Sequence, residues 1–289
     1  MSDPAPLDLD SLRGWIGRTE AATDTITERL VDQFRATLGR HAAPAEADNA
    51  PPAIHWCLAP PAPAPDALAA DGLSKSGGFL PPIRLPRRMW AGGRMTFSQP
   101  LRLGDTVTKV SRIADIIPKS GASGPLVFIT INHQFMTSRG VAIEEWQTIV
   151  YREAAGRSPA GTAAGAGTVP AAAAEAAYSE SVAADPVLLF RYAALTFNSH
   201  RIHYDLDYAR GVEGYRGLVV QGALQATLLL NLASRLNRGA YPREFSCRAT
   251  AALFGGDNFR LHAAAHSASQ TLWIEDSGNR QTFSAVATW

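Results

Sequence analysis

The densest group of chemically capable side chains lies in the segment from Thr196 to Asp205. It holds two of the seven histidines of the chain, together with an amide, a hydroxyl, a guanidinium and a carboxylate. His203 is a candidate general acid/base because an unperturbed imidazole titrates near neutrality. Asn198 can position a water by hydrogen bonds but cannot take its proton. Reactive groups are often carried on such loops, so the cluster predicts proton-transfer chemistry.

Two other interpretations of this cluster stay open. His200, His203 and Asp205 are of residue types that bind zinc, but the further ligand candidates, His262 and His266, stand at no recognised motif spacing. Alternatively, the polar side chains only cap the turn and the helix that follows. The chain has neither a glycine-rich phosphate-binding motif nor a GxSxG nucleophile motif, and no metal or other cofactor is expected.

Gly222 stands directly before a predicted helix over Ala223–Leu236. A glycine at the start of a helix lets a ligand approach the backbone closely, and its N–H lies at the positive end of the helix dipole. Gly222 is therefore a candidate for stabilising negative charge on a bound oxygen. The alternative is a simple tight turn into the helix.

The predicted elements around these residues form two sets. The first half shows helical spacing over 24–40, a Pro- and Ala-rich loop or lid over 43–86, and strand-like runs over 106–116, 126–135 and 142–151. The second half shows the helix and then strand candidates over 244–254, 258–265, 271–275 and 281–288. The helix is apolar almost all round, which indicates that other structure wraps it. This order predicts an antiparallel sheet curled around a buried helix.

Composition divides the chain near its middle. From Pro159 to Ala176, 14 of 18 residues are Ala, Gly or Pro, as is typical of a flexible linker. We therefore expect an amino-terminal domain over 1–153, a linker over 154–182 and a carboxy-terminal domain over 183–289.

A weak internal similarity supports two like domains. A strand-like run from Arg94 leads to Gly104-Asp105, and a similar run from Arg248 leads to Gly256-Asp257.

Charge and cysteine content exclude several classes of protein. The chain has 289 residues, of which 46% are hydrophobic and 18% charged, and its net charge is +1. This balance gives no electrostatic footprint for nucleic acid or a membrane surface, so neither partner is expected. Cys57 and Cys247 form no disulfide framework, and the polar amino terminus does not read as a signal peptide. We expect a cytoplasmic protein.

The stretch from Phe197 to Leu224 resembles the hydratase motif of MaoC-like (R)-specific enoyl-CoA hydratases, and more closely that of type 2 hydroxyacyl-thioester dehydratases. The family pattern is an Asp or Asn, a His five residues later, a Tyr-Ala pair (here Tyr208-Ala209) and a glycine-rich turn into the central helix. In the first half, LPRRMWAGGRMTFSQPLRLGD and EEWQTIVYRE are similar to the amino-terminal domain of mesaconyl-C4-CoA (3-methylfumaryl-CoA) hydratases. The resemblance covers roughly 12–289, apart from the linker.

The resemblance implies an α+β double hot-dog fold, in which two curved antiparallel sheets each wrap a central helix. The carboxy-terminal domain would carry catalysis, and the degenerate amino-terminal domain would shape the substrate pocket. Carried onto this chain, the catalytic residues are Asn198 and His203, with the Gly222 N–H polarising the thioester. Most relatives have Asp in place of Asn198, which leaves His203, helped by Asp205, to transfer protons.

The implied activity is that of a hydro-lyase that adds water reversibly to an enoyl-CoA thioester, with coenzyme A as part of the substrate. A branched C5 dicarboxylic mono-CoA ester such as 3-methylfumaryl-CoA is favoured, and its free carboxylate needs a cationic partner. The candidate substrate-binding residues are Arg201, Tyr204, Arg216, Arg87 and Arg88.

Other activities stay open beside this one. They are itaconyl-CoA hydratase, 3-hydroxyacyl-thioester dehydratase of fatty-acyl metabolism, acyl-CoA thioesterase and a non-catalytic acyl-CoA-binding protein. The spacing from Asn198 to His203, followed by a glycine-opened helix, favours the hydratase. A homodimer is a candidate assembly.

Overall fold

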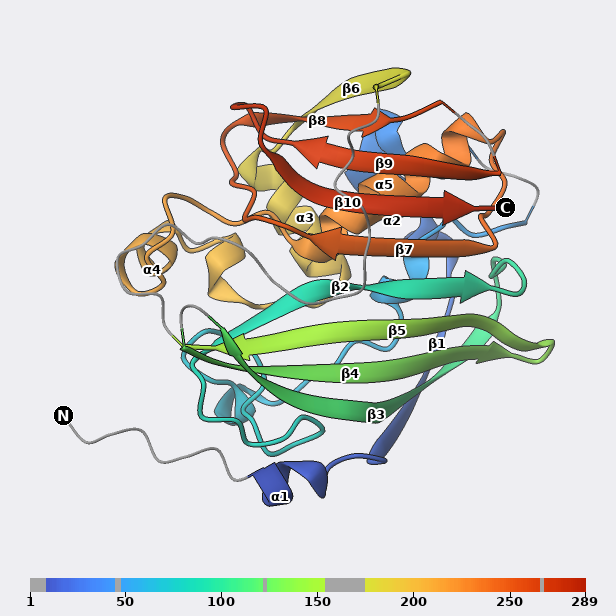
Figure 1. The fold of residues 1–289 in the computed structure, drawn as a ribbon. Coiled ribbons are helices and arrows are strands. Elements are labelled where there is room, and N and C mark those ends of the chain that lie inside the picture. The colour runs from blue at the N-terminus through green and yellow to red at the C-terminus, as the bar shows by residue number, and fades with distance from the viewer. Residues whose placement is uncertain (1–8, 45–47, 122–123, 154–174, 266–267) are drawn as a thin grey trace.

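The computed structural model describes residues 9–44, 48–121, 124–153, 175–265 and 268–289. In these residues the strands form one antiparallel ten-stranded sheet, in the order β1-β3-β4-β5-β2-β7-β10-β9-β8-β6 (Figure 1). The two halves of the chain have the same strand order. β2 and β7, the second strand of each half, meet at the junction, and β1 and β6, the first strand of each half, lie at the outer edges. The strands are β1 (Thr19–Thr25), β2 (Arg87–Phe97), β3 (Thr106–Gly121), β4 (Gly124–Thr137), β5 (Gly140–Arg152), β6 (Tyr178–Ala183), β7 (Glu244–Ala249), β8 (Asn258–Ala263), β9 (Ser269–Glu275) and β10 (Gln281–Thr288).

The sheet of the second half wraps helix α5 (Gly222–Leu236), as the apolar sequence predicts. Residues 224–234 are all buried, and α5 contacts β7 to β10 as well as β2 of the first half. Figure 1 shows α5 behind these strands, with α2 and α3 in the same layer. The other described helices are α1 (Leu9–Arg13), α2 (Glu28–Leu38), α3 (Pro186–Leu195) and α4 (Leu206–Gly211), with 3-10 turns η1 (Gly39–His41), η2 (Ile54–Cys57), η3 (Pro65–Ala67) and η4 (Arg201–His203).

Strands β2 and β7 meet where the halves join, and each of them contains the start of one of the two similar segments. β2 and β7 pair antiparallel, with Gly92 opposite Arg248. Gly92 has φ of 136°, and a Cβ there would lie 2.2 Å from the carbonyl oxygen of Cys247. Only glycine permits this close approach, so the junction of the two halves depends on it.

The long loop over 43–86 is fastened to the central helix by Asn231. The Oδ1 of Asn231 accepts the Ala43 N–H at 2.8 Å, and its Nδ2 donates to the Pro52 carbonyl oxygen at 3.0 Å. Asn231 is fully buried, so these bonds satisfy polar groups that have no access to water. The anchored loop then continues over the first-half sheet.

Two elements were not predicted from the sequence, and part of the expected linker is a strand. β1 is a strand although none of its seven residues is buried, so it carries no apolar alternation. Residues 186–195 form α3, whose first turn is capped by the Asp185 carboxylate at 2.7 Å from the Leu188 nitrogen. Residues 154–174 of the expected linker over 154–182 lie outside the described residues. The last part of that range belongs to strand β6, which pairs with β8.

In the described part of the chain, no helix has the length and apolar character needed to cross a membrane.

Candidate active site

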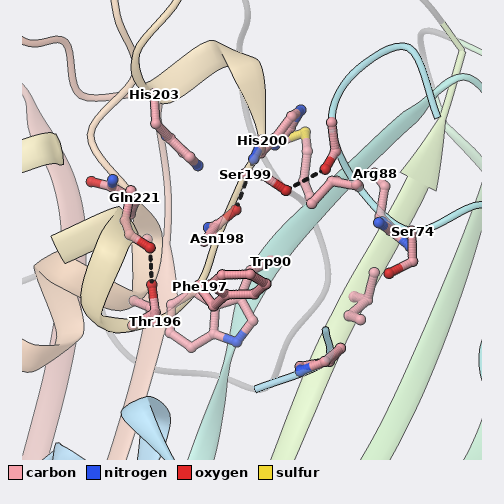
Figure 2. Close-up of a pocket in the computed structure, with 18 of the residues that line it drawn as sticks. Ser74, Arg88, Trp90, Thr196, Phe197, Asn198, Ser199, His200, His203 and Gln221 are labelled. Carbon is pink, nitrogen blue, oxygen red and sulfur yellow. Dashed lines mark hydrogen bonds between the residues drawn. The ribbon is translucent and has the colours of Figure 1, made fainter. Parts of the chain in front are cut away.

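A cavity of about 1410 Å³ lies between the two halves of the chain. Asn198, His203 and Gly222 line it from the second half, and β2 to β5 with the loop residues 61–80 line it from the first. Figure 2 shows the side chains of Asn198, His200 and His203 close together, with Trp90 below them and Arg88 to the right. The structure thus brings together the residues that the sequence proposed for catalysis.

A hydrogen bond fixes the tautomer of His203. The residue ends η4 and is buried, with its Nδ1 only 2.7 Å from the carbonyl oxygen of Val219. Because that carbonyl can only accept, Nδ1 carries the hydrogen and Nε2 keeps a free lone pair. Burial lowers the pKa of His203 to about 4, so the imidazole is neutral at neutral pH. His203 can therefore act as a general base through Nε2.

The side chain of Asn198 is oriented by the backbone that follows it. The side-chain Oδ1 accepts the backbone N–H of His200 at 3.1 Å. The backbone N–H of Asn198 donates to the Ala193 carbonyl oxygen at 2.8 Å. The contact with His200 identifies which end of the amide is oxygen. The free end of Asn198 is its Nδ2 amino group, which is a hydrogen-bond donor only.

Gly222 is the first residue of α5 and lies against the indole of Trp90. A Cβ at this position would lie 2.7 Å from Trp90 Cε3, so a larger residue does not fit. The preceding Gln221 places no side-chain cap on the helix. Among the described residues, no acceptor bonds the Gly222 N–H. This amide is thus a free donor at the positive end of α5, beside the cavity.

Two of the five predicted substrate-binding residues line the cavity, namely Arg88 and Tyr204. Within the described part of the chain, Arg88 forms no ion pair. Tyr204 is half exposed and donates its hydroxyl to the Ser199 carbonyl at 3.1 Å.

The other three predicted arginines lie outside the cavity lining and have carboxylate partners. Their ion pairs are Arg87 with Glu213, Arg201 with Asp205, and Arg216 with Asp257. Arg201 also stacks on Tyr208, with its guanidinium carbon 4.0 Å from the ring centroid. These three guanidinium groups are therefore paired within the protein and do not face the cavity.

Asp205, expected to assist His203, is also engaged elsewhere. Its Oδ1 accepts the Tyr208 N–H at 2.9 Å and caps α4, and its Oδ2 pairs with Arg201 at 2.7 Å. The backbone and Arg201 hydrogen bonds lower the pKa of Asp205. Asp205 is not part of the cavity lining, so its carboxylate is not placed to assist His203. For the same reason it does not join His200 and His203 around a metal.

Sequence reasoning missed a second polar group in the cavity, on the inner face of the first-half sheet. Lys109, His133, Glu145 and Gln147 line the wall together with Trp56. Glu145 is buried and accepts the Trp56 indole N–H at 3.1 Å, and burial raises its pKa to about 7. The sequence carried one signal for this group, namely polar residues at inward positions of neighbouring strands. His133 of β4 lies opposite Glu145 of β5.

The architecture and the site define a class of protein. Two halves of one sheet with the same strand order, a central helix whose first N–H is free, and a neutral imidazole beside that helix are the features to compare with known proteins. A solved structure described as a MaoC-like dehydratase has a TM-score of 0.69 with this chain at 13% identity, covering 96% of it and 99% of that structure. A Mycobacterium tuberculosis protein described as having a double hot-dog fold has a TM-score of 0.55 at 16% identity, covering 94% and 96%.

The sequence comparisons place the chain within one family of that class. The model of the hydroxyacyl-thioester dehydratase type 2 family matches residues 53–255. A Chloroflexus aurantiacus protein named mesaconyl-C(4)-CoA hydratase is 44% identical over 250 residues, which are 86% of this chain and 87% of the relative. The chain belongs to the hydroxyacyl-thioester dehydratase type 2 family and is a hydro-lyase of the hydratase/dehydratase type with an acyl-thioester substrate.

Proposed function

We propose that the chain adds water reversibly across the double bond of 3-methylfumaryl-CoA or a similar branched C5 dicarboxylic mono-CoA ester. The observation that carries the proposal is one cavity lined by His203, the free Gly222 amide and Arg88. The first two serve thioester hydration, and the third is a cation for the second carboxylate. The relative named mesaconyl-C(4)-CoA hydratase supports the same substrate.

The proposed mechanism uses His203 and Gly222 in turn. Nε2 of His203 takes a proton from water as the water oxygen bonds to the β-carbon. The electron pair of the double bond moves toward the thioester, and the enolate oxygen is stabilised by the Gly222 N–H. The imidazolium then returns its proton to the α-carbon, so water is consumed and the imidazole is regenerated. Asn198 supplies an N–H donor beside the reacting atoms.

An absorbance assay for loss of the conjugated enoyl thioester tests the function, with 3-methylfumaryl-CoA and crotonyl-CoA in parallel. We expect faster loss with the dicarboxylic substrate. Preference for crotonyl-CoA would refute the substrate proposal and favour fatty-acyl metabolism. Release of free thiol without hydration would show a thioesterase.

Arg88→Met tests the carboxylate contact. A charge-assisted hydrogen bond is worth about 1.5–3 kcal/mol, so we expect KM for 3-methylfumaryl-CoA to rise about 10- to 100-fold while kinetics with crotonyl-CoA stay unchanged. Arg216→Met is the matched control, because Arg216 pairs with Asp257 outside the cavity lining. An equal loss with both substrates in Arg88→Met would assign Arg88 to another part of the thioester.

Two further expectations accompany this proposal. A homodimer is tested by light scattering of the purified chain. A cytoplasmic location is tested by fractionation of the source cells.

A further inference from the structure

The water that attacks the β-carbon has a requirement that His203 alone does not meet. A lone pair of its oxygen must face the carbon, so both of its hydrogens need acceptors. Nε2 of His203 accepts one hydrogen. One lone pair of the Asn198 oxygen accepts the His200 N–H, which turns this oxygen toward the backbone, and Asp205 is bound to Arg201 and caps α4. A cavity group whose acceptor atoms are not engaged is therefore the better candidate for the second hydrogen.

His200 is placed to be that acceptor. Its ring lies edge to face with that of His203, with centroids 5.4 Å apart and an interplanar angle of 84°. Both imidazoles line the cavity, and Figure 2 shows them on the same side of it as Asn198. Among the described residues, none forms a hydrogen bond with a ring nitrogen of His200. The ring is thus held at the site with its nitrogens free for a ligand.

We propose that His200 is a catalytic residue that holds the nucleophilic water together with His203. A neutral His200 accepts the second hydrogen of the water through a ring nitrogen, while Nε2 of His203 removes the first as a proton. His200 gains and loses no proton in the cycle, so the balance of the hydration is unchanged. The inference rests on the proposed hydration chemistry, and it replaces the carboxylate that Asn198 does not provide.

The surroundings keep His200 in the required neutral form. Burial, His203, Arg88 and Arg87 together lower the pKa of His200 to about 3. Two cationic groups and a second imidazole thus oppose a positive charge on the ring. A neutral imidazole retains the lone pair that a protonated one lacks.

Gln221 is the competing acceptor. Its Oε1 has no hydrogen-bond partner, and its Nε2 donates to the Leu189 carbonyl at 3.0 Å. However, that oxygen is fully buried, whereas a water in the cavity needs an accessible atom. The geometry therefore favours His200, and Gln221→Leu provides the comparison.

The test measures kcat and KM of His200→Ala on every enoyl thioester that the wild type hydrates, with melting temperature as the check on folding. We expect kcat to fall about 100-fold or more, as for loss of a group that orients the nucleophile, and KM to change by less than about threefold. Imidazole added at millimolar concentration should restore part of the rate. His200→Asn, whose amide oxygen can accept the same hydrogen, should be faster than His200→Ala. His262→Asn is the control, because His262 is a buried imidazole outside the cavity lining.

The results separate this inference from the proposed function. If His200→Ala keeps its kcat within about threefold of the wild type, the inference is wrong even where hydration is confirmed. Loss of rate in Gln221→Leu with a normal His200→Ala would transfer the role to Gln221. If only crotonyl-CoA is hydrated, the substrate proposal fails, and the His200 variants are read on that substrate. If His200→Ala does not fold, His200→Leu, which keeps the bulk but has no acceptor, replaces it, and a wild-type rate in His200→Leu would refute the role.

Discussion

Replacing Gly222 with alanine tests how closely the thioester-binding amide depends on Trp90. The added Cβ would lie 2.7 Å from Cε3 and 3.3 Å from Cζ3 of the indole, whereas ordinary contact begins at 3.4 Å. The ring must therefore retreat by about 0.7 Å, or α5 must move by the same amount. The backbone itself tolerates alanine, because Gly222 has no positive φ.

The indole has little room to move. It stacks on Phe283 with centroids 6.0 Å apart and lies 6.1 Å from the Trp56 ring. Overpacking of this kind costs about 1–3 kcal/mol of stability. Displacement of an oxyanion donor costs about 10²- to 10³-fold in kcat, so Gly222→Ala should lose most of its activity while losing only part of its stability.

The assay compares hydration rates and urea unfolding of Gly222→Ala, Trp90→Phe and the double variant. Trp90→Phe removes an indole N–H that is buried without a partner, so its own cost is mainly that of a smaller side chain. The double variant should recover activity relative to Gly222→Ala, because phenylalanine lacks the fused benzene ring of the indole, which carries Cε3 and Cζ3. Gly211→Ala is the control, since nothing lies within 4 Å of a Cβ there. Wild-type rate and stability in Gly222→Ala would refute the packing argument.

Three further predictions concern pH and buried hydrogen bonds. The acid limb of kcat/KM should lie near pH 4 rather than 6.5, because burial lowers the pKa of His203 to about 4; a rate profile with a limb at 6.5 would contradict this. The pKa of His133 is lowered by burial to about 4, so its contribution to stability is complete above pH 6.5 and is lost as the pH falls toward 4. Replacing His133 by Gln should therefore reduce the pH slope of unfolding free energy by up to about 1.4 kcal/mol per pH unit in that window, as measured by urea titration. Asn231→Leu leaves the Ala43 N–H and the Pro52 carbonyl without partners, and it should lower the unfolding free energy by about 2–4 kcal/mol; a loss below about 0.5 kcal/mol would show that water replaces the side chain.

The sequence predicted the parts of the fold that depend on strong local patterns. The continuous apolar run of α5 required a wrapped helix, and β-branched runs marked β3, β4 and β5. The spacing of Asn198 and His203 and the glycine at the start of α5 singled out three residues that line one cavity. These features are encoded within short segments, so they can be recognised without knowing the tertiary contacts.

Tertiary pairing decided the rest. Arg87, Arg88 and Arg216 are equivalent as sequence residues, and only the fold shows that Arg88 faces the cavity while the other two meet carboxylates. Asp205 could likewise be a base or a helix cap, and the position of Tyr208 makes it the cap. Glu145 is near its partners in space but far from them in sequence, so no local pattern joins it to Trp56.

Helix α5 lies against strands β7 to β10 of the second half, and the catalytic residues of the proposed mechanism are all in that half. In the first half, inward side chains of β3 to β5, such as Ile131 and Gln147, line the cavity directly. Changes on this wall should therefore alter the preferred acyl group more than the proton transfers. The Gln147 oxygen is bonded to His133 Nε2 at 3.1 Å, and its amino group remains available to a substrate. Gln147→Leu removes this donor but keeps the size, so the ratio of kcat/KM for crotonyl-CoA over 3-methylfumaryl-CoA should rise by about 3- to 10-fold for one neutral hydrogen bond, with kcat for crotonyl-CoA unchanged. An equal fall of kcat with both substrates would mean that this wall takes part in the chemistry.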